Sequence, residues 1–249
     1  MGMKQILLMM VAVVVVGCGK DARKAEPLPE PDPAPPAEDK VITIADPFVE
    51  GEIRASLEKP DDEITEADLE KVLWLSLEGT KITDAVLKDV AKLQKLRELD
   101  LTSTKITDAG LEEVAKLQSL ETLLMAGTDI TDAGLEEVAK LQSLETLFMD
   151  GTGITDEGLK KVATLQKLEL LGLETTKITN AGLLEVAKLQ KLERLALTTT
   201  QITDVGIKEL AKMKKLVWLN LIQTQVTEAG VAELQKALPN CEIFSNFTK

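Results

Sequence analysis

Two acidic side chains, Glu98 and Asp100, have the spacing of a catalytic carboxylate pair. They alternate with Leu99 and Leu101, so on a β-strand both carboxylates would face the same side at a separation of roughly 6.5–7 Å. This separation falls within the range found in inverting glycoside hydrolases. Such catalysis also needs a pocket that raises one of the two pKa values by burial, and an open sheet surface provides none. The pair alone therefore does not predict an enzyme.

Other catalytic groups are missing from the sequence, which contains no histidine and no tyrosine. Histidine is the commonest acid–base group and the commonest transition-metal ligand. The sequence also has no glycine-rich phosphate-binding loop and no cluster of metal ligands. We therefore predict a protein that is not an enzyme, with no catalytic residue, no cofactor and no metal site.

A stack of glutamates recurs every 24 residues, at Glu121, Glu145, Glu169 and Glu193. Carboxylates stacked about 5 Å apart repel one another, and they would select a basic partner or a cation. Neighbouring lysines would neutralise much of this charge; they are Lys167, Lys191 and Lys215. We therefore favour a solvated surface over a binding site for this stack.

These features recur because the chain itself is repetitive. Residues 106–123 and 130–147 both read ITDAGLEEVAKLQSLETL, and seven units of 24 residues follow one another over residues 72–239. Their consensus is L-x-x-L-x-L-x-x-T-x-I-T-D-x-G-L-x-x-V-A-x-L-x-x. A fixed period of this length is typical of a solenoid, in which each unit packs only against its neighbours.

Each unit predicts a strand, a turn, a helix and a second turn. Leu99 and Leu101 alternate as they would on one face of a short strand. Thr107 is a natural helix N-cap, and Asp108 would interact favourably with the helix dipole. The i,i+4 spacing predicts ion pairs on the outer helix surface, namely Glu112–Lys116 and Glu136–Lys140.

The repeated units resemble the leucine-rich repeat family, and T-x-I-T-D-x-G-L is closest to its F-box-type and bacterial GALA-type subclass. The resemblance implies an α/β fold, a right-handed solenoid or horseshoe with a concave parallel β-sheet and convex helices. The family usually has Asn or Cys at the ninth position, where this chain has Thr80, Thr104, Thr128, Thr152, Thr176, Thr200 and Thr224. Hydroxyl groups there can satisfy some backbone groups of the turn. The chain has no F-box-like segment, so a role in ubiquitin transfer is not expected.

Atypical segments flank the repeats and are expected to cap the solenoid. In the N-terminal cap, residues 41–71, we expect one apolar helix side; it consists of Phe48, Ile53 and Leu57. Thr65 and Asp68 in the same cap have the spacing of a capping box.

The C-terminal cap comprises residues 240–249, and an edge strand is expected within residues 238–244. Phe244 and Phe247 are predicted to cover the end of the core. Cys241 is most simply a small residue in this cap, with a reactive thiol as the alternative.

Residues 1–17 are predicted to be a signal peptide, because Lys4 precedes an apolar run of 11 residues from Ile6 to Val16. This run is too short to span a bilayer. It ends in Val15-Val16-Gly17-Cys18, which resembles the lipobox of bacterial lipoproteins. The resemblance implies that Cys18 becomes lipidated and anchors the chain in a bacterial cell envelope, at the outer membrane if the cell has two membranes. The alternative is an ordinary secretory signal with a chance cysteine.

Residues 18–40 are predicted to form a tether rich in proline and acidic residues. Such a composition cannot form a core and favours an extended polyproline II conformation. At about 3.1 Å per residue, the tether would reach at most about 60 Å and would hold the repeats clear of the lipid head groups.

The formal net charge of −13 limits the choice of partners. Nucleic acids and anionic membrane surfaces bind clustered lysine and arginine, so we predict no nucleic-acid partner. We expect membrane contact only through the lipid on Cys18.

The concave sheet is the usual binding surface of leucine-rich repeat proteins, so a site is expected at its outward-facing positions. Water alone would select polar residues there, yet Leu124, Phe148 and Leu170 should form an apolar patch about 10 Å across, on three adjacent strands. An apolar patch bordered by charges is typical of a protein-binding hot spot. The predicted partner-binding residues are Trp74, Asp100, Leu124, Phe148, Leu170, Arg194 and Trp218.

We therefore predict a lipid-anchored envelope protein whose concave face binds another protein or peptide. The alternative is a structural spacer of the envelope without a specific ligand. Trp74 and Trp218 lie in the two end repeats, where each would either contact a partner or pack beneath a cap.

Overall fold

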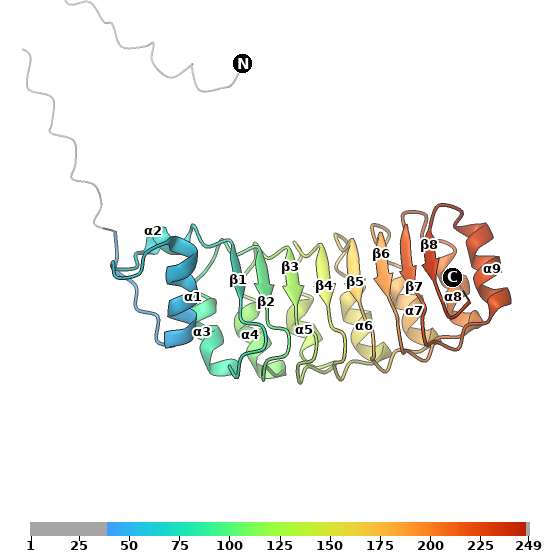
Figure 1. Cartoon of the computed structure of the whole chain (residues 1–249), viewed down its shortest axis with the longest axis horizontal. Helices are drawn as coiled ribbons and strands as arrows, with labels where there is room; N and C mark the ends of the chain where they lie inside the picture. The colour runs from blue at the N-terminus through green and yellow to red at the C-terminus, as the bar shows by residue number, and fades with distance from the viewer. Residues whose placement is uncertain (1–38, 248–249) are drawn as a thin grey trace, which may run out of the picture. The chain divides into compact units, whose positions relative to one another are not determined.

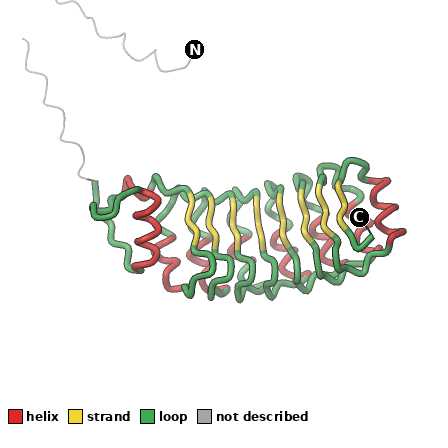
Figure 2. The backbone as a smooth tube through the Cα atoms, viewed as in Figure 1, coloured by secondary structure: helices red, strands yellow, loops and turns green. Residues whose placement is uncertain are grey.

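A parallel sheet of eight strands, ordered β1 to β8 as in the sequence, runs through the computed structural model, which describes residues 39–247. The helices of successive repeats are stacked on the other side of the sheet (Figures 1 and 2). The signal peptide, Cys18 and the tether up to residue 38 lie outside the described residues. The strands are β1 (Trp74–Ser76), β2 (Glu98–Asp100), β3 (Thr122–Leu124), β4 (Thr146–Phe148), β5 (Leu170–Gly172), β6 (Arg194–Ala196), β7 (Trp218–Asn220) and β8 (Glu242–Phe244).

Within residues 39–247, two helices precede β1, and one helical segment then follows each strand up to β7. In two of the repeats this helical segment opens with a 3₁₀ turn, η1 (Asp84–Val86) and η2 (Asp108–Gly110). The α-helices are α1 (Pro47–Leu57), α2 (Glu66–Leu69), α3 (Leu87–Val90), α4 (Leu111–Val114), α5 (Leu135–Val138), α6 (Asp156–Val162), α7 (Asn180–Val186), α8 (Asp204–Leu210) and α9 (Glu228–Ala237). No helix within residues 39–247 is long and apolar enough to cross a bilayer.

The register of the sheet follows the 24-residue period. Leu75 pairs with Leu99, Leu99 with Leu123, and the same shift continues to Ile243 on β8. These central leucines point inward and are buried, together with the other repeated apolar positions of each unit. The predicted solenoid with a parallel sheet on one side and helices on the other is therefore confirmed.

The aspartate of the repeated I-T-D segment links each repeat to the next. Asp108 accepts hydrogen bonds from the backbone N–H of Thr131 at 2.8 Å and from its hydroxyl at 2.6 Å. The same clamp recurs along the stack, as Asp84–Thr107, Asp132–Thr155, Asp156–Thr179 and Asp204–Thr227. Asn180 takes this place once and binds the N–H and hydroxyl of Thr203 through its amide. The prediction for Thr107 is thus only half right: it occupies the N-cap position, but its hydroxyl binds Asp84 instead of capping the helix.

The glycine of the same motif makes room for this clamp. A Cβ at Gly134 would collide with the carboxylate oxygen of Asp108 and with a methyl group of Leu111. An alanine at this position would therefore displace the carboxylate that holds Thr131. The T-D-x-G motif therefore serves two purposes: it starts the helix, and it leaves room for the contact between successive repeats.

The threonine at the ninth position closes the turn within its own repeat. The hydroxyl of Thr128 donates to the carbonyl of Met125 at 2.7 Å, three residues earlier. The equivalent threonines make the same bond at 2.6–2.7 Å. Each hydroxyl therefore satisfies a backbone carbonyl of the turn, as expected. The carbonyls of Leu77 and Leu221 also accept a backbone N–H, from Thr80 and Thr224.

The ion pairs on the outer helix surface differ from the predicted ones. Lys116 binds Glu113 and Lys140 binds Glu137, both at i,i+3 spacing. The predicted partner Glu136 instead binds Lys161 of the next repeat at 2.6 Å. The helices explain the difference, since α4 and α5 end at Val114 and Val138 and do not hold the i,i+4 geometry as far as the lysines.

The N-terminal cap packs through a different side of α1 than predicted. Val49 and Ile53 are fully buried, whereas Phe48 is 42% exposed. Val49, Ile53 and Leu57 are four residues apart and share one helix face, and Phe48 lies one position out of phase with it. The predicted capping box is present, with Thr65 and Asp68 each binding the backbone of the other.

The C-terminal cap contains the expected edge strand, β8. Leu238, Cys241 and Ile243 are buried there and close the core, but Phe247 is 49% exposed and does not cover it. Burial raises the pKa of the Cys241 thiol to about 11, so the sulfur stays protonated at neutral pH. Cys241 is therefore a small core residue of the cap.

Candidate functional site

The concave face consists of two rows of side chains that alternate with the buried leucines of the strands. One row begins at Trp74 and the other at Ser76, and each passes straight from strand to strand in register. The first row is Trp74, Glu98, Thr122, Thr146, Leu170, Arg194 and Trp218, and the second is Ser76, Asp100, Leu124, Phe148, Gly172, Ala196 and Asn220. The 24-residue period thus brings residues that are distant in sequence onto one surface.

A first hollow of about 240 Å³, the N-terminal hollow, lies over β1, β2 and β3. Trp74, Glu98, Asp100, Thr122 and Leu124 line it. One carboxylate oxygen of Asp100 accepts the backbone N–H of Thr102 at 2.9 Å, which fixes the side chain at the end of its strand. The hollow therefore combines an indole ring with two carboxylates.

A second hollow of about 150 Å³, the C-terminal hollow, lies over β4 to β7. Its lining is mostly apolar and consists of Phe148, Leu170, Leu171, Arg194, Ala196 and Trp218. Small residues make the space: Ala196 lies on its floor, and neighbouring Gly172 leaves room for the ring of Phe148.

The seven predicted partner-binding residues fall into two groups. Trp74, Asp100 and Leu124 line the N-terminal hollow. The other four, Phe148, Leu170, Arg194 and Trp218, line the C-terminal hollow. The apolar patch expected as one surface is therefore shared between two hollows, which adjoin where Leu124 pairs with Phe148.

The two tryptophans differ in their relation to the caps. Trp74 remains 52% exposed beside the N-terminal cap. Trp218 is half-buried and packs against Phe244 of β8, with ring centroids 5.7 Å apart and planes tilted by 46°. Trp74 is thus available to a partner. Trp218 forms a wall of the C-terminal hollow and is held by its contact with Phe244 of the cap.

The sequence did not predict a partly buried acidic pair, Asp150 and Glu174, which lies just beyond the ends of the strands. Asp150 accepts the backbone N–H of Glu174 at 2.6 Å, and Glu174 accepts the hydroxyl of Thr198 at 2.6 Å. Burial, and the nearby charge of Glu174, raise the pKa of Asp150 despite its hydrogen bonds. The repeat pattern gives no signal for this pair, because the seventh position of the other repeats varies freely.

The glutamate stack shows no sign of a cation site. Glu121 binds Arg97 at 3.4 Å, and within the described residues Lys167, Lys191 and Lys215 form no ion pair with the stack. These lysines therefore do not neutralise the stack by direct contact, and their neutralising effect at longer range stays a prediction. Within residues 39–247, no three or more potential metal ligands lie close enough together to hold an ion.

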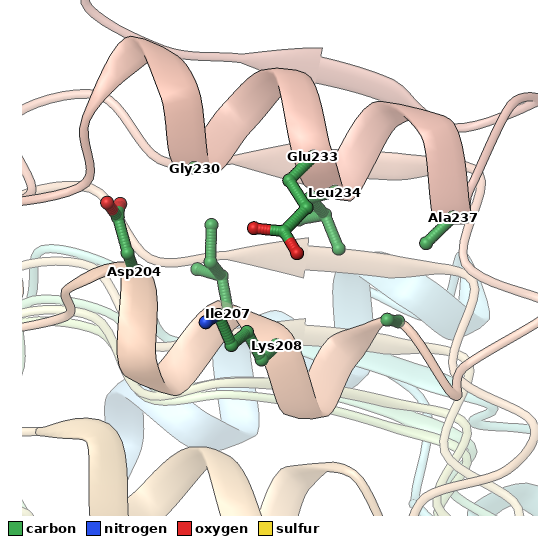
Figure 3. Close-up of a pocket in the computed structure, with 8 residues that line it drawn as sticks. Asp204, Ile207, Lys208, Gly230, Glu233, Leu234 and Ala237 are labelled. Atoms are coloured by element: carbon green, nitrogen blue, oxygen red, sulfur yellow. The ribbon is translucent and has the colours of Figure 1, made fainter.

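On the helical side, a hollow of about 290 Å³ separates α8 from α9. Figure 3 shows Asp204 and Lys208 on one wall and Glu233 and Leu234 on the other. The carboxylate of Asp204 already binds Thr227 at 2.8 and 2.7 Å. This hollow is therefore a seam between two repeats, and we place the candidate site on the concave face.

Comparison with known proteins identifies the family and the fold. The family model of the leucine-rich repeat region matches residues 66–234. Among curated proteins, no sequence matches the chain. The crystal structure of internalin C2 from Listeria monocytogenes superposes with a TM-score of 0.62 at 26% identity, over 81% of this chain and 93% of the internalin.

A second internalin of Listeria monocytogenes, internalin F, gives a TM-score of 0.53 at 16% identity, over 82% of this chain and 96% of its own. That likeness concerns the fold alone. Because the family model covers most of the sequence, including all seven repeats at least in part, the chain belongs to the leucine-rich repeat family.

Proposed function

We propose that this chain is a lipid-anchored protein of the bacterial cell envelope that binds another protein or peptide on its concave face. Modules of this family typically bind proteins, and no enzyme family matches the chain. The observation that carries the proposal is the patch of large apolar residues on an otherwise open sheet. Leu124, Phe148 and Leu170 remain partly exposed where water alone would favour polar side chains.

The anchoring part of the proposal rests on the sequence Val15-Val16-Gly17-Cys18 after an apolar run. Its test is metabolic labelling with a fatty-acid analogue, followed by cell fractionation. We expect labelled full-length chain in the membrane fraction, and loss of both label and membrane association in Cys18→Ser. Unchanged membrane association of Cys18→Ser would contradict the lipid anchor.

The binding part is tested with residues 39–249, which form one compact unit, as bait in an envelope extract. The test variant is Leu124→Asp combined with Phe148→Asp. A matched control carries the same change on the helical side, Leu184→Asp combined with Val205→Asp, at two exposed positions. Circular dichroism and thermal melting establish that each variant stays folded.

We expect the wild-type bait and the helical-side control to capture the same partner, and the concave-face variant to lose it. Equal capture by all three baits, or capture lost only in the control, would contradict a site on the concave face. No capture by any of them would favour the structural spacer, since a spacer needs no ligand on this face.

A further inference from the structure

We propose that the ligand is an extended peptide that crosses the strands and places a lysine or arginine in the N-terminal hollow and a bulky apolar side chain in the C-terminal hollow. This inference rests on the proposed function and specifies the chemistry of its ligand. It follows from the different lining of the two hollows and from the distance between them.

The N-terminal hollow suits a cationic side chain. Glu98 and Asp100 form no ion pair with any lysine or arginine of the described chain, so both negative charges are available. Trp74 is 52% exposed beside them and offers the face of an indole ring. A guanidinium or ammonium group gains from both, through charge-assisted hydrogen bonds and cation–π attraction.

The C-terminal hollow suits one apolar side chain. Its volume of about 150 Å³ lies well below the roughly 300–1,000 Å³ of a small-molecule pocket, so it has room for a single leucine-sized or phenylalanine-sized group. Phe148, Leu170, Ala196 and Trp218 surround that space. Trp218 is held in place by Phe244, so this wall is formed before a ligand arrives.

Arg194 determines where on the peptide an acidic residue is favoured. It lies at the C-terminal hollow, is exposed, and forms no ion pair within the described residues. A carboxylate next to the apolar side chain would bind it, whereas a carboxylate over Glu98 and Asp100 would be repelled. The concave face therefore favours a peptide that is basic at one end and apolar, then acidic, at the other.

The spacing of the hollows sets the spacing of the two anchor residues. The N-terminal hollow is centred on β2 and the C-terminal hollow between β5 and β6. At about 4.8 Å per strand, these centres are roughly 17 Å apart. An extended chain advances about 3.3 Å per residue and turns alternate side chains to the same side, so the anchors should be four or six residues apart.

The test uses a set of fluorescein-labelled synthetic peptides, measured by fluorescence anisotropy with residues 39–249. Each peptide has one Lys and one Phe followed by Glu, separated by serine and threonine so that the anchors lie two to eight residues apart. A second set has Gln in place of Lys. We expect the tightest binding at separations of four and six, with about a tenfold preference for Lys over Gln at low ionic strength.

Two variants test the contribution of each hollow to peptide binding separately. Glu98→Gln with Asp100→Asn should reduce the preference for Lys to less than about twofold, while the preference for Phe over Ser persists. Ala196→Leu fills the C-terminal hollow and should remove the preference for Phe, while that for Lys persists. Raising the salt concentration should weaken the Lys preference alone.

Equal binding of the Lys and Gln sets, or no dependence on anchor separation, would overturn this inference. If the envelope partner is still captured through Leu124 and Phe148 in that case, the proposed function stands and only the peptide chemistry is wrong. If capture and peptide binding both survive the concave-face variant, both proposals fail together.

Discussion

The ring of Phe148 on β4 occupies the space next to Gly172 on β5, where any side chain would collide with it. A Cβ built on Gly172 meets the ring carbon Cδ1 of Phe148 and a carboxylate oxygen of Asp150 at 2.7 Å. The two residues are paired in register on adjacent strands. The conformation of Phe148, and with it one wall of the C-terminal hollow, therefore depends on the absence of a side chain at residue 172.

We predict that Gly172→Ala destabilises the protein by about 1–2 kcal/mol, because the added methyl group overpacks this contact. The measurement is urea denaturation. In a Phe148→Ala background the same Gly172→Ala change should cost less, because the collision with the ring is removed and only the contact with Asp150 remains. An equal cost in both backgrounds would show that the strain does not come from Phe148.

The clamp between repeats predicts a contrast between two substitutions of one residue. Asp108→Ala removes two hydrogen bonds to Thr131 and should cost about 2 kcal/mol. Asp108→Asn should cost less than about 0.5 kcal/mol, because Asn180 makes both equivalent bonds to Thr203 in this same chain. The free energy of unfolding is the readout. A cost for Asn as large as that for Ala would mean that charge, rather than geometry, holds the repeats together.

A third prediction concerns the turn that follows β5. Thr175 has a φ of 56°, in the left-handed region that β-branched residues avoid. Thr175→Gly should therefore stabilise the protein by about 1 kcal/mol. Its neighbour Thr176 donates its hydroxyl to the carbonyl of Leu173 at 2.6 Å, so Thr176→Val should destabilise by about 1 kcal/mol. Thermal melting distinguishes the two, and effects of the same sign would contradict this reading of the turn.

A fourth prediction concerns pH. Burial raises the pKa of Asp150 above its value in the unfolded chain, so folding favours the protonated form of this group. The contribution of Asp150 to stability is therefore most favourable below the unfolded pKa and declines as the pH rises through the folded pKa. Asp150→Asn keeps an acceptor for the N–H of Glu174 and removes the partly buried charge.

The variant Asp150→Asn should accordingly gain stability relative to wild type as the pH increases from about 3 to 7. The difference between the two unfolding free energies is the quantity to follow, since other carboxylates, such as Asp68 and Asp204, have lowered pKa values and act in the opposite direction. A constant difference across this range would contradict the raised pKa.

The fold was predictable from the sequence because one 24-residue pattern specifies both the buried positions and the strand register. Leu99 and Leu123 occupy equivalent positions and therefore pair in adjacent strands. Phe48 shows the limit of such reasoning: an error of one residue in helical phase places a side chain in solvent. The hydrogen bonds of Asp108 were not foreseen, because they join residues 23 positions apart in different repeats.

The candidate site was predictable only as a surface. The two-residue alternation of strands identified Trp74, Phe148 and Arg194 as outward-facing, and the structure places them there. The division into two hollows depends on how neighbouring side chains fill space. Gly172 and Ala196 decide that shape by being small, and the sequence pattern does not mark either of them.

Site-specific photo-crosslinking in cells that express the full chain tests the concave-face site most directly. The photoreactive amino acid benzoylphenylalanine replaces Thr146, beside Phe148 and Leu170 on the concave face, or Leu184, an exposed residue of α7 on the helical side. We predict an adduct with one partner from position 146 and none from position 184, and loss of the adduct when Phe148→Asp is added. An adduct from position 184 alone, or equal adducts from both positions, would contradict binding on the concave face.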